Sequence, residues 1–241
     1  CDPKRYCAEK YDLLARTSND LDGIKHIISE ICRADLPDDG VWFDSDSVTT
    51  TRIAEDADYE GVRATFAGRL ATTRISMQID IGFSDVVTPG PVEISYPTIL
   101  DYPAPVLRAY NRETVIAEKF DTMVSLGRLN SRMKDFFDVW LLASTSDFSG
   151  ADLSAAILAT FRRRGTELNA VPQAFEDDFL FDPSKRSQWT GFLKRMRPSE
   201  APSTFSDALI SIRAFLQPVH EALCSGDSFT MTWKHPGPWR Q

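Results

Sequence analysis

The chain has 241 residues, of which 42% are apolar, so it is long enough for one large domain or two small ones with a buried core. Its formal net charge of −8 argues against a protein coated in positive potential for non-specific binding to nucleic acid. No apolar run approaches the roughly 18 residues that a membrane-spanning helix needs, and the first residues lack the apolar core of a signal peptide, so we expect a cytoplasmic protein with no membrane partner.

The N-terminal part combines a helical pattern with strand patterns. Isoleucines at helical spacing follow an Asn19/Asp20 cap and predict an amphipathic helix over residues 19–34. Strands are predicted over residues 41–43, 62–70 and 74–83, the last two joined as a hairpin. This part is therefore predicted to be α/β.

The last of these strands carries a carboxylate on its polar side. Over residues 75–83 apolar side chains alternate strictly with others, and successive side chains of a strand point to opposite faces. Asp80 is therefore expected on the face opposite to the packed one. Such a position fits the polar face of any amphipathic strand, but a rigid strand also holds a metal ligand better than a loop does.

A proline-rich passage separates this part from a helical one. Five prolines between residues 89 and 105 exclude a regular helix, and we place the boundary behind them, with domains at residues 1–108 and 109–241. Helices are predicted from Asn111 to a stop at Gly127, and over residues 132–143, 153–164, 183–197 and 205–224. The tail with Trp233 and Trp239 is expected to be extended and packed against these helices.

Two of these helices carry charged residues beside their apolar stripes. Lys119, in the first, is able to place a point charge on a phosphate oxygen, although a lysine at the edge of a stripe commonly extends to solvent. Lys134 and Asp138 are four residues apart and suit an ordinary helix ion pair worth about 0.2–0.5 kcal/mol. Asp135 has only Arg132 as an intrahelical cation, which makes it the more informative carboxylate.

The chain also has two local basic clusters. Residues 162–164 are Arg-Arg-Arg, and residues 194–197 are Lys-Arg-Met-Arg. Each falls near the end of a predicted helix, where cations complement the helix dipole, and we interpret both clusters in that way.

The order of these segments is more informative than any one of them. A strand with the sequence QIDIGFSD is followed by the proline-rich link, the helix RAYNRETVIAEKF and the helix NSRMKDFFDVWLL. In this order the chain resembles the nucleotidyltransferase toxin family of abortive-infection type, AbiEii/AbiGii. The resemblance runs from about residue 13 to the final tryptophans and is most specific over residues 61–142.

The resemblance implies a fold, an activity and partners. The fold would be a polymerase-β-like nucleotidyltransferase domain with a mixed sheet, partly incomplete at the N-terminus, followed by a helical domain. The activity would be that of the toxin in a toxin–antitoxin module, which uses a nucleoside triphosphate (NTP) and Mg2+ to transfer a nucleotide to an RNA such as transfer RNA. A cognate antitoxin protein would be its partner. Carboxylates suit this chemistry because they hold divalent ions, which neutralise the triphosphate.

Carried over residue by residue, the family pattern assigns roles to four positions. Asp80 resembles the third metal carboxylate, and Lys119 and Asp135 resemble the lysine and aspartate near the nucleotide. Lys134 is a weaker match for a phosphate contact. On this interpretation Asp80, Lys119 and Asp135 reach one cavity.

The upstream part of the family pattern allows two alignments. That part consists of a Gly-Ser turn and an Arg-x-Thr-x-Asp-x-Asp stretch whose aspartates are metal ligands. In one alignment Asp12 is the second aspartate and Lys10 replaces the first. In the other, Asp20 and Asp22 are the pair, but helix capping explains both residues equally well. We prefer the first, which makes Asp12 and Asp80 the predicted metal ligands.

The sequence therefore supports two hypotheses. The leading one is a nucleotidyltransferase-like toxin in which Asp12 and Asp80 hold Mg2+ and Lys119 binds the triphosphate. The alternative is a non-catalytic interaction protein with a decayed nucleotidyltransferase fold that binds an antitoxin or RNA, and Lys10 at a ligand position favours it. A metal-dependent nuclease is a weaker hypothesis, because no strand pair carries the carboxylate and lysine spacing that such a site needs.

Overall fold

The computed structural model describes residues 10–35, 39–54, 60–98, 101–168 and 172–241. The chain forms two compact units that divide between Asp85 and Val86. The first is built around a sheet and the second around helices, which confirms the predicted fold class of a mixed α/β sheet followed by a helical part. The predicted domain boundary at residues 108/109 lies further along the chain than this division.

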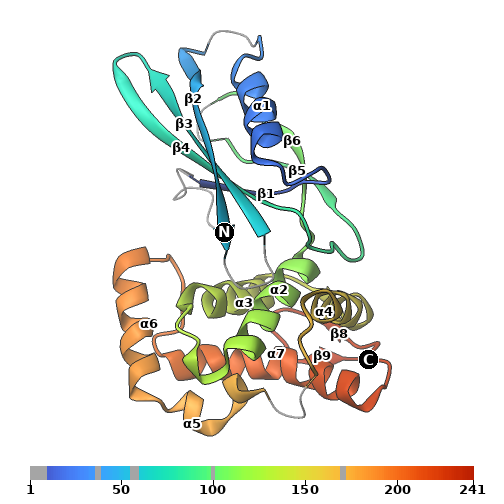
Figure 1. Ribbon diagram of the computed structural model, residues 1–241. Coiled ribbons are helices and arrows are strands. Elements are labelled where there is room, and N and C mark those ends of the chain that lie inside the picture. Colours follow the sequence, from blue (N-terminus) through green and yellow to red (C-terminus); the bar gives the residue numbers. More distant parts are fainter. Residues whose placement is uncertain (1–9, 36–38, 55–59, 99–100, 169–171) are drawn as a thin grey trace. The chain divides into compact units, whose positions relative to one another are not determined.

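The sheet of the first unit has four strands. They are β1 (Lys10–Leu14), β2 (Val41–Ala54), β3 (Glu60–Leu70) and β4 (Thr73–Gly82), in the spatial order β1-β4-β3-β2. The three longer strands are antiparallel neighbours, whereas β1 pairs in parallel with β4. Figure 1 shows β3 and β4 as a long twisted hairpin. The sheet is therefore mixed, and β1, which the patterning did not predict, places its residues beside β4.

One face of this sheet is packed against a helix. The helix α1 (Leu21–Cys32) contributes Ile24 and Ile28 to a small core. The strands contribute Val48, Val62, Ala64 and Ile81. Ile27 and Ile31 are exposed, so the buried stripe of α1 is narrower than the isoleucine pattern predicts.

The proline-rich passage is extended, as predicted, but part of it is paired. It contains a short antiparallel hairpin of β5 (Val92–Ser95) and β6 (Val106–Ala109), which belongs to the second unit. The prolines flank the paired residues, where a missing N–H group removes no hydrogen bond of the ladder.

The second unit contains the five predicted helices, each within a few residues of its predicted range. They are α2 (Arg112–Leu126), α3 (Met133–Thr145), α4 (Gly150–Arg164), α6 (Pro183–Met196) and α7 (Phe205–Ser225). A short helix α5 (Asp177–Leu180) and two 3-10 turns, η1 (Gly127–Leu129) and η2 (Gln173–Phe175), were not predicted. Asn111 begins α2 as predicted, by accepting a 2.7 Å hydrogen bond from the Thr114 N–H. Within the described ranges, no helix is long and apolar enough to cross a bilayer.

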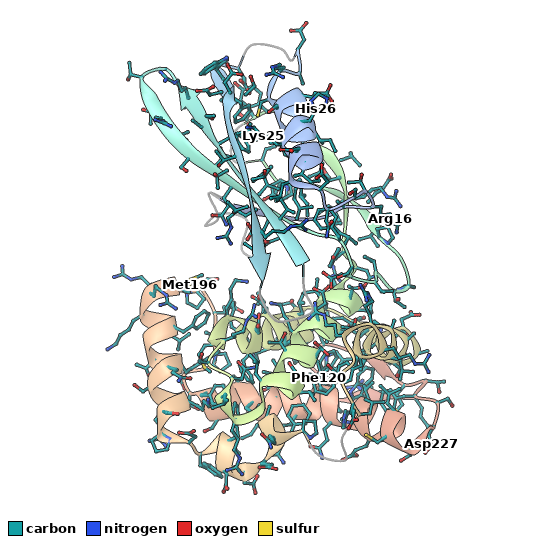
Figure 2. The ribbon with its side chains drawn as sticks, in the orientation of Figure 1. Arg16, Lys25, His26, Phe120, Met196 and Asp227 are labelled. Atoms are coloured by element: carbon teal, nitrogen blue, oxygen red, sulfur yellow. The ribbon has the colours of Figure 1, made fainter. Side chains whose placement is uncertain are left out.

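Aromatic side chains fill the core of the helical unit. Phe120 of α2, labelled in Figure 2, is fully buried. Its ring lies 5.5 Å from that of Phe161 and 5.6 Å from that of Phe175, measured between centroids. This packing fixes α2 against α4 and η2, and therefore fixes the charged residues that α2 carries.

The C-terminal tail packs against the helices, as predicted. Strands β7 (Phe148–Ser149), β8 (Thr232–Trp233) and β9 (Trp239–Arg240) form a small antiparallel sheet. Both tail tryptophans are buried. The indole N–H of Trp233 donates to the Ala143 carbonyl at 2.7 Å, and that of Trp239 donates to the Phe215 carbonyl at 2.8 Å. These bonds satisfy the polar ends of two large buried rings.

Candidate functional site

Two carboxylates lie side by side on the polar face of the sheet. In the parallel register of β1 with β4, Asp12 is paired with Asp80. Paired residues point to the same face, and this face is the one opposite α1, because the neighbouring Ile81 belongs to the core under α1. Asp12 is exposed, whereas Asp80 is buried. The structure thus brings together the two predicted metal ligands.

Asp80 is oriented by two side chains of its own sheet. Arg63 is its partner on β3, and the guanidinium donates to both carboxylate oxygens, from Nε at 2.8 Å and from Nη2 at 2.9 Å. Gln78 adds a third bond, from Nε2 to Oδ1 at 3.1 Å. The side chain of Asp80 is 7% exposed and that of Arg63 is 36% exposed, so this bidentate pair on the two central strands is partly open to solvent.

The residues of the two alternative alignments lie in different elements. Lys10 lies in β1, two residues before Asp12, and is paired in register with Gln78. Asp20 instead forms the N-cap of α1, where it accepts a 2.7 Å hydrogen bond from the Gly23 N–H. Asp20 therefore has the capping role that the sequence had also suggested.

The sheet offers few donors for a divalent ion. Among the described residues, no group of three or more Asp, Glu, His or Cys side chains is placed to hold a metal. Asp12 and Asp80 fit a single Mg2+, which proteins commonly hold with one or two carboxylates together with substrate phosphates and water. A second Mg2+ does not fit these donors, and Arg63 competes with any cation for Asp80.

A partly buried lysine lies between α2 and α3. Nζ of Lys119 is 2.8 Å from Oδ1 of Asp135 and 2.8 Å from Oδ2 of Asp138. The two carboxylates are three residues apart on α3, so both face α2. The side chain of Lys119 is only 17% exposed. The sequence pattern placed Asp135 and Asp138 off the apolar stripe, yet both are buried, because Lys119 supplies a buried opposite charge.

Two further cations complete this cluster. Nζ of Lys134 is 2.7 Å from Oδ2 of Asp138, which confirms the predicted ion pair within α3. Nε of Arg132 is 3.0 Å from Oδ2 of Asp135, although the geometry is not that of a hydrogen bond. Three cations thus surround two carboxylates, and the cluster carries one net positive charge. Lys119 has three N–H donors and contacts two acceptors in the described part of the chain, so its third donor is available to an anion such as phosphate.

The charges in the cluster stabilise one another. Burial by itself lowers the pKa of Lys119, but the carboxylates of Asp138 and Asp135 outweigh it and raise that pKa above its ordinary 10.5. Burial by itself raises the pKa of Asp138, but Lys119 and Lys134 outweigh it and lower that pKa below its ordinary 3.8. Lys119 and Asp138 are therefore both charged at neutral pH.

Sequence reasoning missed two of these residues. Arg63 occupies a polar-face position of the predicted strand at residues 62–70, and this position was the available signal. Asp138 was assigned only to Lys134, although its spacing of three residues from Asp135 indicated a shared partner. The roles of Lys119, Lys134 and Asp135 at a nucleotide stay predictions. The cavity that Lys119 and Asp135 would share with Asp80 also stays a prediction, because Asp80 belongs to the other unit.

Comparisons with known proteins identify relatives of the chain. Residues 11–211 match a family model described as the nucleotidyl transferase AbiEii toxin of a type IV toxin–antitoxin system. No curated protein matches. One similar solved structure is described as a candidate nucleotidyltransferase from H. pylori; it is 14% identical, the match covers 94% of this chain and 84% of that one, and the TM-score is 0.48. Another is JHP933 from Helicobacter pylori, with 14% identity, coverage of 92% and 80%, and a TM-score of 0.47.

Proposed function

The chain belongs to the AbiEii nucleotidyl transferase toxin family, and from that premise we propose that it transfers a nucleotide from an NTP to an RNA acceptor, with transfer RNA as the first acceptor to test. Family membership makes it a nucleotidyltransferase-like toxin of a type IV toxin–antitoxin system, with an antitoxin as partner. We place the reaction in the cytoplasm, where NTPs and transfer RNA occur.

The register of β1 with β4 is the observation that carries this proposal. It sets Asp12 beside Asp80 on the polar face, which is the arrangement that two carboxylates need to share one ion. We take these two side chains as the Mg2+ ligands. A magnesium ion held there would neutralise the triphosphate and lower the pKa of the attacking RNA hydroxyl.

The protein's own residues supply orientation and charge. Arg63 and Gln78 orient the Asp80 carboxylate. In this proposal Arg63 releases one of the two Asp80 oxygens, and that oxygen then binds the cation. Asp135 and Asp138 fix the Lys119 ammonium, whose third N–H donates to a triphosphate oxygen in this proposal. Phosphoryl-transfer sites act through positioning and charge stabilisation, and a fixed ammonium contributes to both.

A second candidate function is supported by one cation on the sheet and by one residue of the sequence motif. The Arg63 guanidinium holds both oxygens of Asp80, where a metal would otherwise supply the positive charge. In the preferred alignment, Lys10 replaces the first family aspartate in the sequence. On this evidence the chain would be a non-catalytic member of the family that binds RNA or an antitoxin.

A transfer assay separates the two functions. The purified chain is incubated with each labelled NTP in turn, Mg2+ and total transfer RNA, with a chelator control. We expect label in RNA, and a loss of about 100-fold to 1,000-fold in Asp80→Ala, because removing one charge-stabilising group costs about 3–4 kcal/mol of transition-state stabilisation. Circular dichroism verifies that the variant is folded.

Asp22→Ala is the matched control. It removes a carboxylate from the first turn of α1, on the other side of the same unit, and we expect it to leave transfer unchanged. A loss in Asp22→Ala equal to that in Asp80→Ala would instead support the alternative alignment. No label in RNA with a folded wild-type chain and all four NTPs contradicts the transferase and favours the non-catalytic function.

A further inference from the structure

The polar face of the sheet continues well beyond its two carboxylates. Side chains on this face alternate with the core residues along β3 and β4, so Arg63, Thr65 and Arg69 share it, as do Arg74 and Ser76. Within the described part of the first unit, α1 is the one helix, and it packs on the opposite face (Figure 1). We call the part formed by Trp42, Ser47, Thr65, Arg69, Arg74 and Ser76 the arginine face.

Two arginines of this face stand directly opposite each other. Arg69 is paired with Arg74 in the antiparallel register, next to the tip of the hairpin. Both are exposed, and neither has an ion-pair partner among the described residues. Like charges at directly opposed positions destabilise a sheet. The pairing of Arg69 with Arg74 therefore adds no stability to the free sheet, whereas an anion that bridges the two guanidinium groups would stabilise it.

An exposed aromatic ring and a hollow lie next to these arginines. Trp42 of β2 is 55% exposed, and the guanidinium carbon of Arg69 lies 5.7 Å from the centre of its ring. Beside them is a hollow of about 390 Å3. Its lining residues are Ser47, Thr65, Phe66, Ala67, Arg74 and Ser76. The face therefore combines cations, hydroxyl groups and one stacking surface.

We propose that the arginine face binds a single-stranded segment of RNA. Proteins that bind single strands combine cations along the phosphates with aromatic rings on which bases stack, and arginine planes also stack on bases. The exposed Ser76 hydroxyl in the hollow is able to bond to ribose or base edges, whereas those of Ser47 and Thr65 already form hydrogen bonds within the sheet. Phosphates bridging Arg69 and Arg74 remove the repulsion that the free sheet carries.

The position of this face indicates which part of the RNA it holds. Arg74 and Asp80 lie six residues apart on β4, or about 20 Å at the usual rise per residue. That length corresponds to a few nucleotides. This step rests on the proposed function: the bound segment is the strand that leads to the reacting end of the acceptor, and that end lies toward Asp12 and Asp80.

The carboxylates close to this face do not pair with its arginines. Asp80 is bound by Arg63, and the exposed Asp46 lies 3.3 Å from Arg33. Oδ1 of Asp44 accepts a hydrogen bond from the Asp46 N–H at the bulge of β2. Arg69 and Arg74 form no ion pair with a described residue, so both guanidinium groups are available to phosphate despite the net charge of −8.

Binding of a labelled, unstructured RNA oligonucleotide to the full chain tests this inference, by fluorescence anisotropy without NTP or Mg2+. We expect the double variant Arg69→Ala/Arg74→Ala to weaken binding by about tenfold or more and to reduce the slope of log affinity against log salt by about 1.4, because two phosphate contacts are lost. Trp42→Ala should weaken binding by about 5-fold to 150-fold and Trp42→Phe much less, since a ring remains for stacking.

The matched control is Arg162→Ala/Arg163→Ala, which removes two exposed arginines at the end of α4 and changes the net charge equally. Unchanged affinity in the arginine-face variants, or an equal loss in this control, overturns the inference. An affinity for poly-glutamate equal to that for RNA also overturns it, because the face would then select charge alone.

The transfer assay keeps this inference distinct from the proposed function. If the arginine-face variants transfer nucleotides at the wild-type rate and with an unchanged KM for RNA, the result contradicts the inference and is consistent with the transferase. If the wild-type chain binds RNA but transfers nothing, and the arginine-face variants lose RNA binding, the result supports the arginine face and contradicts the transferase. A wild-type chain that binds no RNA contradicts both.

Discussion

The sheet and the helices fix a charged side chain in different ways. In the sheet, the charge partner of Asp80 is Arg63, which the register of β3 supplies and which is partly exposed. In the helices, Lys119 is enclosed by two carboxylates of α3 and is mostly buried. A bound cation is therefore able to replace Arg63 at modest cost, whereas displacing Lys119 would leave two buried carboxylates without their common cation.

The cores around these two sites also differ. The sheet unit has a small core under α1, and the helical unit has an extensive aromatic core. We therefore expect local stability to differ between the units, and unfolding of the whole chain need not be two-state. Hydrogen exchange reports the stability of each unit separately. Four of the five tryptophans, all except Trp42, lie in the helical unit, so tryptophan fluorescence reports mainly on that unit.

Replacing Lys119 should produce the largest loss of stability. Lys119→Met leaves Asp135 and Asp138 buried without their common cation, and we expect the helical unit to lose about 2–4 kcal/mol. This is less than a fully buried pair would lose, because Lys134 and Arg132 remain. Urea unfolding followed by tryptophan fluorescence measures it. A change below about 1 kcal/mol would contradict the view that this cluster is held by its central lysine.

Replacing Arg63 should cost less and should couple to metal. Arg63→Gln removes a bidentate partner of Asp80, and we expect about 1–3 kcal/mol of lost stability in the sheet unit, measured by hydrogen exchange of β3 and β4. Mg2+ should then protect this variant more than the wild type, since Asp80 is freed to bind it.

Arg74→Gln is the matched control for that change. Arg74 lies on the same face as Arg63 and stands opposite Arg69. Its removal relieves the repulsion between two like charges, so the stability of the sheet unit should stay the same or rise slightly. If Mg2+ protects wild type and Arg63→Gln equally, Arg63 does not compete with the metal for Asp80.

Acid should weaken the helical unit through Asp138. The pKa of this carboxyl is lowered in the folded state, so its contribution to stability is fully present above the ordinary 3.8 and is lost as pH falls through the lower folded value. Urea titrations between neutral pH and pH 2 measure the loss, and Asp138→Asn should show less of it. If the free energy of unfolding depends on pH identically in the wild type and in Asp138→Asn, Asp138 is not the cause of the loss of stability in acid.

The smallest expected effect is that of Lys134. Its side chain is 51% exposed, and the pair with Asp138 is an ordinary pair of neighbouring turns. Lys134→Met should therefore cost only about 0.3–0.5 kcal/mol in urea unfolding. Lys194→Met on α6, which is also exposed, is the control and should cost less still. A loss comparable to that of Lys119→Met would show that the two lysines share the central role.

The helical unit was predictable because its signals are local. Asn111 caps α2 and Gly127 ends it, and both residue types act within one turn of the helix. The strands β1, β5 and β6 were missed because a short strand is stabilised by its partner, which lies elsewhere in the chain. The same reason explains Arg63, whose role is visible only once β3 is paired with β4.

The sequence by itself determined that Asp80 lies on the polar face of a strand, that Lys119 and Asp135 lie on two helices, and to which family the chain belongs. These features follow from alternation, caps and the order of motifs, all of which are properties of neighbouring residues. Only the tertiary structure decided that Asp12 lies beside Asp80, that Arg63 holds Asp80, and that Lys119 lies between Asp135 and Asp138. Those contacts depend on strand register and helix packing, which join segments far apart in the chain and leave no local pattern.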